Sequence, residues 1–233
     1  MELCGGAGHS YEIAKKLSKS GLLIGIDRDK EAISAAKEKM KDLENVIYYH
    51  GNHDNIKNIL DELKIKSVDG ILLDLGVSSY QLDERNRGFS YIGDANLDMR
   101  MDTSQELTAK MVVNEYKEEQ LIKIFFEYGE EKFSKNIARK ICEYRKNKQI
   151  ETTKELVDII ETSIPNWSKN KNSHPAKRVF QAIRIEVNDE ISPLYNTVRN
   201  SIKCLKSGGR LCIITFHSLE DRAVKKAYSD ASR

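Results

Sequence analysis

The sequence predicts an α/β fold, in which helices cover a mostly parallel sheet and a helical segment is inserted before the last strand. Short apolar runs alternate with amphipathic stretches over residues 10–75, and this alternation predicts βαβ units. A further apolar run at 210–216 follows a long helical stretch and predicts a strand that returns to the same sheet. Glycines at three of the four positions 5–8 predict a strand-to-helix turn near the start.

The first 75 residues supply most of the expected sheet. Ser10 is the expected N-cap of a helix that ends near Gly21. Asp54 is the expected cap of a later helix, which carries its apolar side chains on one face. The expected strands of this half are 22–26, 46–49 and 69–75, and a helix is expected at 31–40.

After residue 75 the alternation stops. Residues 76–101 form a polar, glycine-containing connection, whose length is uncommon unless it has a function. Thr152 with Glu155 fits a capping box, and Pro175 suits the first position of a helix. The expected helices are 108–116, 118–128, 131–147, 153–163, 175–187 and one that ends near 205. The expected domains are a sheet domain at 1–103 and 176–233 and a helical insertion at 104–175.

Composition restricts the class of protein. The 233 residues allow one large domain or a domain with an insertion, and 39% hydrophobic residues indicate a sizeable core. No apolar run approaches the roughly 20 residues of a membrane span, and the N-terminus lacks a signal-peptide pattern. The four cysteines are far apart, which favours buried free thiols over disulfides or a zinc site. These features predict a cytoplasmic protein.

The net charge of +2 does not by itself indicate a nucleic-acid-binding protein. Basic residues are nonetheless concentrated in 132–148 and again in 169–184. Charge of this kind is usually the solvated face of a helix, and this is the simpler interpretation. A surface that contacts RNA is the alternative, and it needs support from other features.

Several polar stretches follow or end an expected strand. In an open parallel sheet, ligands bind beyond the carboxyl ends of the strands, where these stretches would meet. Their coincidence is a stronger indication of a site than any one of them. The stretches are 5–9, Asp27, 50–53, 74–81 and 216–218.

The glycine turn and Asp27 together indicate a nucleoside-containing cofactor. A turn without Cβ atoms lets backbone N–H groups approach a ligand, and Asp27, about twenty positions later, suits the ribose hydroxyls. The structural alternatives are a glycine turn without a ligand and an Asp27 that caps the next helix. NAD requires a further small residue for close packing of helix and strand, but Tyr11 stands there. This favours S-adenosylmethionine.

Three further residues are candidates for binding or catalysis. His53 follows the expected strand 46–49, at a position where its ring would stack on an adenine. The alternative is a histidine in a surface loop. Asp74 ends a very apolar strand, where an unpaired charge is costly. It therefore faces the cofactor and a substrate amine, or else it caps the following loop. Gln81 either hydrogen-bonds the cofactor or lies on the surface.

His217 ends the last expected strand and is a catalytic candidate after Asp74, with a structural hydrogen bond as the alternative. No Ser–His–acid triad is indicated, because no serine lies in a nucleophile elbow. His50 and His53 lack the carboxylate or cysteine pattern of a metal site, so no metal is expected.

Longer motifs are more specific than these single residues. They are Gly5–Ser10, Gly25–Asp29, Asp69–Ser79, Arg87–Ser90, Leu97–Asp102, Tyr128–Glu131, His174–Ala176, Arg178–Arg184 and Phe216–Arg222. In this order they resemble the MraW-type enzymes, the ribosomal RNA small-subunit methyltransferase H family. The resemblance runs through essentially the whole chain.

The resemblance implies a class I S-adenosylmethionine-dependent (Rossmann-like) fold with a helical insertion. It also implies N4-methylation of a cytidine in the decoding region of 16S (small-subunit) rRNA, with the small ribosomal subunit as partner. Asp74, and after it His217, become the expected acceptors for the cytidine amine, and Arg178 and Arg184 belong to the expected RNA surface. Matched by motif, the cofactor-binding residues are Ala7, Gly8, His9, Asp27, His53, Asp74 and Gln81.

The chain departs from the family pattern at identifiable positions. His53 stands where phenylalanine is usual, and Tyr80 stands where proline is usual. Family members also begin earlier, with the first strand of the sheet, and continue well beyond Arg222, so a shortened form is expected. Two other functions stay open: a non-catalytic RNA-binding remnant, and a methyltransferase or oxidoreductase that acts on another substrate.

Overall fold

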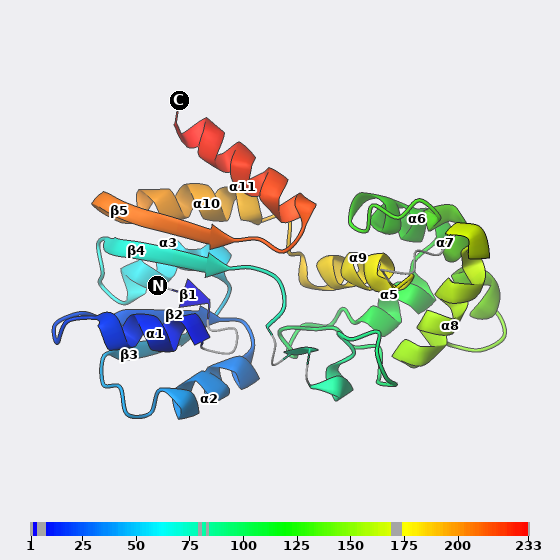
Figure 1. The fold of residues 1–233 in the computed structure, drawn as a ribbon, viewed down its shortest axis with the longest axis horizontal. Coiled ribbons are helices and arrows are strands. Elements are labelled where there is room, and N and C mark those ends of the chain that lie inside the picture. Colours follow the sequence, from blue (N-terminus) through cyan, green and yellow to red (C-terminus); the bar gives the residue numbers. More distant parts are fainter. Residues whose placement is uncertain (1, 4–7, 79–80, 83, 169–173, 233) are drawn as a thin grey trace. The chain divides into compact units, whose positions relative to one another are not determined.

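The computed structural model describes residues 2–3, 8–78, 81–82, 84–168 and 174–232 (Figure 1). The chain divides into two compact units. The first comprises Met1–Tyr80 and Glu190–Arg233, and the second comprises Gln81–Asp189. The second unit therefore extends beyond the expected insertion, 104–175, at both of its ends.

A parallel sheet forms the centre of the first unit. Strand β2 (Leu23–Asp27) pairs with β1 (Glu2–Leu3) and with β3 (Val46–His50), and β4 (Val68–Asp74) pairs with β5 (Leu205–Ile214). Each of these pairings is parallel. β1 also contacts β4, so the spatial order is β3, β2, β1, β4, β5. The parallel sheet expected from the alternation of strands and helices is confirmed.

Helices cover both faces of this sheet. One face carries α1 (Gly8–Lys16) and α2 (Lys30–Lys39), and the other carries α3 (Ile56–Glu62), α10 (Leu194–Lys203) and α11 (Ser218–Ala231) (Figure 1). Ile24 of β2 and Ile71 of β4 belong to the same buried cluster as Leu194 of α10. Tyr48 of β3 packs on the opposite side, against Met40 at the end of α2. Successive strand residues point to opposite faces, so each strand contributes to both layers.

Two of the expected helix caps are wrong. α1 begins at Gly8, so Ser10 lies in its first turn, fully buried, and does not precede the helix. Asp54 lies inside a 3-10 turn, and α3 follows Asn55, whose side chain makes no capping hydrogen bond. In both cases the chain enters helical geometry before the position that the sequence pattern indicates. α11 was not among the expected helices.

The second unit is mainly helical. Its helices are α5 (Ala109–Glu115), α6 (Glu118–Glu127), α7 (Ser134–Tyr144), α8 (Thr153–Ser163) and α9 (Lys177–Asn188). They lie at the expected positions, although α7 is shorter than 131–147 at both ends and α9 begins at Lys177 rather than at Pro175. The capping box of Thr152 and Glu155 at the start of α8 is confirmed.

Hydrogen bonds explain why the connection before the helices belongs to the second unit. The backbone N–H of Ala95 donates to Thr153 Oγ1 at 3.0 Å, at the start of α8. The buried side chain of Asn188, at the end of α9, accepts from Met101 N–H at 2.8 Å and donates to Met99 O at 2.7 Å. The connection is thus tied to both helices, and this is why the domain boundary lies outside 104–175.

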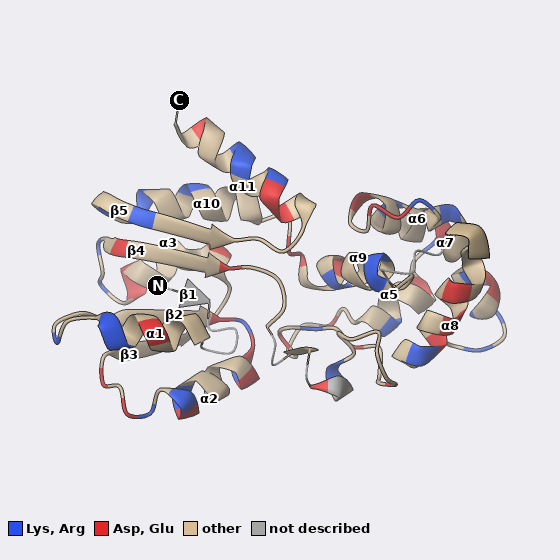
Figure 2. Ribbon diagram, in the orientation of Figure 1, with Lys and Arg blue, Asp and Glu red and all other residues tan. Residues whose placement is uncertain are grey.

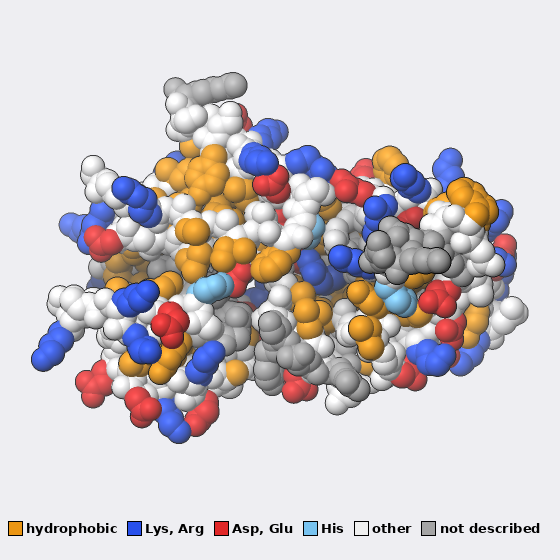
Figure 3. Space-filling model, in the orientation of Figure 1, with side chains coloured by type: hydrophobic (Ala, Val, Ile, Leu, Met, Phe, Trp, Pro, Cys, Tyr) orange, Lys and Arg blue, Asp and Glu red, His pale blue; other side chains and the backbone are white. Residues whose placement is uncertain are grey.

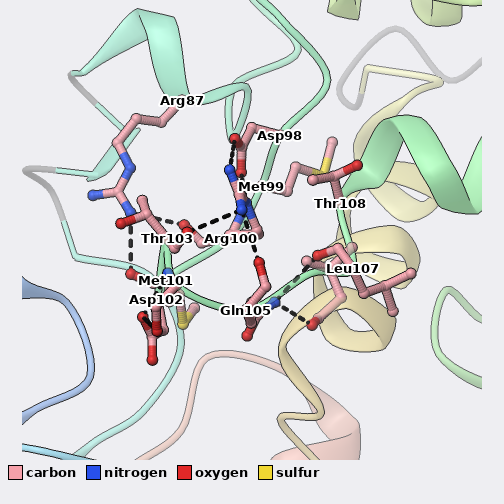
Figure 4. Close-up of polar contacts among 12 residues, drawn as sticks. Arg87, Asp98, Met99, Arg100, Met101, Asp102, Thr103, Gln105, Leu107 and Thr108 are labelled. Atoms are coloured by element: carbon pink, nitrogen blue, oxygen red, sulfur yellow. Dashed lines mark hydrogen bonds and ion pairs between the residues drawn. The ribbon is translucent and has the colours of Figure 1, made fainter.

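Arg100 holds the same connection together (Figure 4). Its guanidinium donates to both carboxylate oxygens of Asp98, at 2.8 Å each, and to the carbonyl oxygens of Thr103 at 3.0 Å and Gln105 at 2.8 Å. Partial burial acts to raise the pKa of Asp98, but the hydrogen bonds from Arg100 hold it below its usual range. Arg87 donates in turn to the carbonyl oxygen of Arg100 at 2.7 Å. This arginine network therefore has a structural role.

Candidate functional site

The carboxyl edge of the first unit's sheet carries most of the expected site residues. Asp27 ends β2, Asp74 ends β4, and His9 lies in the first turn of α1. His53 follows β3 in a 3-10 turn, and His217 follows β5 as the N-cap of α11. Because the strands are parallel, their carboxyl ends share one edge of the sheet, as the sequence predicts.

Asp74 joins two elements of this edge. Its Oδ2 lies 3.4 Å from His9 Nδ1, and its side chain is 19% exposed. Its Oδ1 is buried and has no hydrogen-bond partner among the described residues. Residues 75–78 donate no backbone N–H to it, so the loop-capping alternative finds no support in this part of the chain. An unpartnered, buried carboxylate oxygen is costly, and it suits a donor from a ligand.

Asp27 has a raised proton affinity. Its Oδ1 accepts a hydrogen bond from the backbone N–H of Asp29 at 2.8 Å. Burial raises the pKa of Asp27 to about 6, and the Asp29 amide opposes this only in part. The helix-cap alternative for Asp27 is wrong, because Asp29 is the N-cap of α2 and accepts from Glu31 N–H at 3.0 Å. Asp27 therefore remains a candidate for ligand binding.

His53 is buried, with 5% of its surface exposed, so the surface alternative is wrong. Its Nδ1 lies in a hydrogen bond with Asn52 Oδ1. Burial, and after it the charge of Arg28, lowers the pKa of His53 to about 3. The ring is therefore neutral at physiological pH.

His217 has a structural role at the start of α11. Its Nδ1 accepts from the backbone N–H of Glu220 at 3.5 Å. Its Nε2 lies 3.3 Å from Glu220 Oε1, and the two side chains are 9% and 2% exposed. These contacts support the structural alternative for His217, and its catalytic role remains a prediction.

Glu190 joins His217 and Glu220 in a buried cluster. One possible ligand atom of each residue lies within 4.8 Å of the other two. Among the described residues, these three are therefore close enough together to hold a metal ion. Nδ1 of His217 accepts a hydrogen bond from Glu220 N–H at 3.5 Å, and its buried Nε2 has no hydrogen-bond partner among the described residues. The absence of a metal remains a prediction.

Four expected site residues, Ala7, Gln81, Arg178 and Arg184, are not among the described residues of the first unit. Ala7 lies outside the described residues. Gln81, Arg178 and Arg184 belong to the second unit. Gln81 is buried, so its surface alternative is wrong. Arg178 is exposed and donates to Glu130 O at 2.9 Å, which ties α9 to the turn after α6, and Arg184 is half-buried.

Basic residues of 132–148 have partners within the second unit. Arg145 donates to Val113 O at 2.7 Å, and Lys140 lies 3.5 Å from a carboxylate oxygen of Glu143. Figure 2 shows basic and acidic residues interspersed along the helices of the second unit. Solvated and internally paired helix faces thus account for part of this charge. An RNA-binding surface here remains a prediction.

Sequence reasoning gave three residues of the first unit, Phe216, Glu220 and Ser10, no individual role in the site. Phe216, two residues after the end of β5, is 64% exposed, and its backbone N–H donates to Oε2 of the buried Glu220 at 2.7 Å. Ser10 is buried, and its Oγ has no hydrogen-bond partner among the described residues. Phe216 and Glu220 lie in a recognised motif, but no sequence pattern signals that the aromatic ring is exposed and the carboxylate buried.

The residues at the carboxyl edge of the first unit's sheet fit a nucleoside cofactor that carries charged and polar groups. Ser10 Oγ of α1 and Asp74 Oδ1 at the end of β4 are among the buried oxygens that have no partner within the described residues. A Cβ added at Gly8 would meet no atom of the described residues within 4 Å. The first turn of α1 also supplies backbone N–H groups that no helical carbonyl accepts.

The fold and this edge define an α/β domain of the kind that binds a nucleoside cofactor at the ends of its strands. The model of the MraW methylase family matches residues 3–233. The chain belongs to the MraW methylase family, and it is therefore a methyltransferase.

Named relatives agree with this family. Over 229 residues the chain is 59% identical to the ribosomal RNA small subunit methyltransferase H of Clostridium botulinum (strain 657 / Type Ba4), covering 98% of this chain and 74% of that protein. It is 55% identical over 225 residues to the protein of the same name from Clostridioides difficile (strain 630), covering 96% of this chain and 72% of that protein. Within the described residues, every helix is too short or too polar to cross a membrane.

Proposed function

We propose that this methyltransferase transfers the methyl group of S-adenosylmethionine to N4 of a cytidine in the decoding region of 16S rRNA. The observation that carries the proposal is the buried Oδ1 of Asp74, which lacks a partner among the described residues at the carboxyl edge of the sheet. The similarity to relatives named ribosomal RNA small subunit methyltransferase H supports the choice of substrate. The protein then acts on ribosomal subunits in the cytoplasm.

The first unit would hold the cofactor, which supplies an electrophilic methyl group on a sulfonium centre when bound. Asp27 would accept hydrogen bonds from the ribose hydroxyls, which favour its ionised form against the burial that raises its pKa. His53 would offer a neutral, flat ring to the adenine. Gly8 and His9 lie in the first turn of α1. Ala7 and Gln81 complete the set that the resemblance implies.

Asp74 would act on the substrate amine. The exocyclic amine of cytosine is a poor nucleophile, because its lone pair is delocalised into the ring, so catalysis consists mainly of orienting the nitrogen towards the methyl carbon. Asp74 Oδ1 would accept one N4–H, which favours a more tetrahedral and nucleophilic nitrogen. The new N–C bond forms as the S–C bond breaks, and the surplus proton leaves N4 for Asp74 or for water. His217 is the second candidate, although its Nδ1 already accepts a hydrogen bond from Glu220 N–H.

The second unit would contact the RNA. Its insertion, 104–175, carries the basic stretch, and α9 adds Arg178 and Arg184. Contacts of arginine with phosphates position an RNA without reading its sequence. We therefore assign orientation of the RNA to these residues and choice of the base to the carboxyl edge of the first unit.

Methyl transfer from labelled S-adenosylmethionine to small ribosomal subunits, followed by mapping of the modified nucleotide, tests the proposal. The expected result is label at N4 of one cytidine in the decoding region. Label at another nucleotide would contradict the assigned substrate. A chain that binds RNA but, in calorimetry, does not bind S-adenosylmethionine would be a non-catalytic RNA-binding protein, and the proposed activity would then be wrong.

A further inference from the structure

Phe216 is an exposed aromatic residue at the carboxyl edge of the first unit's sheet. It follows β5 and is 64% exposed. The other large apolar residues that are exposed among the described residues of this unit are Leu22, before β2, and Tyr228, whose hydroxyl donates to Leu211 O at 3.1 Å. A single exposed apolar side chain needs no functional explanation. The position of Phe216 distinguishes it from the other two.

The ring of Phe216 lies against Gly76, close to Asp74. The register of the sheet pairs Asp74 with Ile214, and Leu75 N–H donates to Ile214 O at 3.1 Å. Two residues further along each strand, a Cβ added at Gly76 would lie 3.3 Å from Phe216 Cδ2. The φ of Gly76 is +78°, which also favours glycine. The backbone that follows Asp74 is therefore in contact with this ring.

The backbone of Phe216 is anchored although its ring is exposed. Its N–H donates to Oε2 of Glu220, which is 1% exposed, and Oε1 of Glu220 lies 3.3 Å from His217 Nε2. Figure 3 shows apolar side chains gathered over the carboxyl halves of β4 and β5. An aromatic ring on a fixed backbone binds a flat ligand at a low cost in conformational entropy.

We propose that Phe216 stacks on the target base and holds it with its exocyclic amine at Asp74. This inference rests on the proposed function and identifies how the same site takes its substrate. An enzyme that modifies a base must reach it outside the helical stack, and it holds the base against aromatic or apolar side chains. Aromatic rings bind the unstacked bases of RNA in the same way.

The proposal also explains two neighbouring features. Gly76 has no side chain, so the ring of Phe216 can lie directly against the backbone that follows Asp74, where a Cβ would be only 3.3 Å from Cδ2. Glu220 holds the backbone of Phe216 from the buried side and leaves the ring to the ligand. The ligand class is a single unstacked pyrimidine of RNA, stacked by Phe216 and bound through its amine by Asp74.

Steady-state kinetics with small ribosomal subunits test the role of Phe216. Phe216→Leu is expected to raise KM for the subunit or lower kcat/KM about tenfold or more, and Phe216→Trp is expected to retain most of the activity, because stacking needs a π-face. The affinity for S-adenosylmethionine, measured by calorimetry, should not change in either variant. Tyr228→Leu is the control, since Tyr228 is another exposed aromatic residue of the first unit, 37% exposed on α11. Equal kinetics of Phe216→Leu and Tyr228→Leu would overturn the proposal.

A binding measurement separates this inference from the proposed function. In a Trp167→Phe, Phe216→Trp variant the only tryptophan reports on stacking, because Trp167 is the single tryptophan of the chain. An oligonucleotide with the decoding-region sequence should quench its fluorescence, and the same oligonucleotide with an abasic site at the target should quench it much less. Equal quenching by both would overturn the stacking proposal. If quenching depends on the base but the protein transfers no methyl group to the subunit, then the stacking proposal holds and the proposed activity is wrong.

Discussion

His9 and Asp74 contact each other between the first turn of α1 and the end of β4, with Nδ1 and Oδ2 3.4 Å apart. The His9 side chain is 58% exposed and that of Asp74 is 19% exposed, so the imidazole lies on the outer side of the pair. Only one carboxylate oxygen is engaged, and Oδ1 is buried without a partner among the described residues. The contact therefore orients the carboxylate through one oxygen and leaves the other for a ligand.

Asp74→Asn is expected to lower turnover about a hundredfold or more, since it removes the acceptor for the amine proton, while it changes the affinity for S-adenosylmethionine much less. Methyl transfer to small ribosomal subunits and calorimetry with the cofactor measure the two effects. Asp69→Asn is the matched control on the same strand, because the Asp69 side chain is 84% exposed and pairs with Lys206 at 2.8 Å. Equal losses of turnover and of cofactor affinity in Asp74→Asn would exclude a catalytic role.

Cofactor binding is expected to depend on the ionisation of Asp27. Burial raises its pKa from 3.8 to about 6. The folded pKa lies above the unfolded one, so the contribution of Asp27 to stability is fully present below pH 3.8 and is lost as the pH rises through about 6. Ribose hydroxyls donate best to the ionised form, so cofactor affinity should fall as the pH drops below 6, up to about tenfold per pH unit.

Calorimetry between pH 5 and pH 8 measures this dependence. Asp27→Asn should bind the cofactor weakly at all of these pH values and lose most of the pH dependence. His53→Phe should keep it, because the pKa of His53 is lowered to about 3 and the ring does not titrate in this range. An unchanged pH profile in Asp27→Asn would show that another group controls binding.

The sequence allowed the sheet and most of the site to be predicted, for one physical reason. Each strand of a parallel sheet is buried between helices, so it appears as a short apolar run, and the residue that follows it must lie at the carboxyl edge. Asp27 and Asp74 were found in this way. Ser10 was misassigned as a cap because the rule for helix starts uses the first apolar position, whereas α1 begins at Gly8.

Long-range contacts were not predictable by the same means. The boundary of the second unit depends on hydrogen bonds of Asn188 with Met99 and Met101, far apart in the sequence. The burial of Glu220 likewise depends on the packing of α11, a helix that was not predicted from the sequence. A single polar or aromatic residue carries no periodicity, so its depth in the fold follows only from the tertiary structure.

Arg100→Lys is expected to destabilise the second unit by about 2 kcal/mol, because lysine cannot form the paired contact with Asp98 and leaves carbonyl oxygens without donors. Urea unfolding followed by circular dichroism measures the free energy of unfolding. Arg139→Lys is the control, since Arg139 is exposed and lies 3.9 Å from Glu143 on the surface of α7. Equal stabilities of the two variants would show that the network of Arg100 contributes little.

Arg184→Ala and Arg178→Ala are expected to weaken binding of the small ribosomal subunit and to reduce the slope of log K against log salt by about 1 each, if each arginine contacts one phosphate. Binding measured between 50 and 200 mM salt, roughly the range over which such contacts weaken, gives the slope. Lys206→Ala is the control, because Lys206 is paired with Asp69 in the first unit. Slopes equal to that of the control would assign the two arginines to the structure of the second unit alone.

Gly76→Ala is expected to lower both stability and activity. At φ of +78° any Cβ is strained, at a cost of about 1–2 kcal/mol, and here the Cβ would also lie 3.3 Å from the ring of Phe216. Gly93 separates the two effects, because its φ is +95° but a Cβ there would meet no atom within 4 Å. Gly93→Ala should therefore show the loss of stability without the loss of activity. A Gly76→Ala variant that is destabilised to the same extent as Gly93→Ala, yet methylates small subunits at the wild-type rate, would show that the contact between Gly76 and Phe216 does not matter for substrate binding.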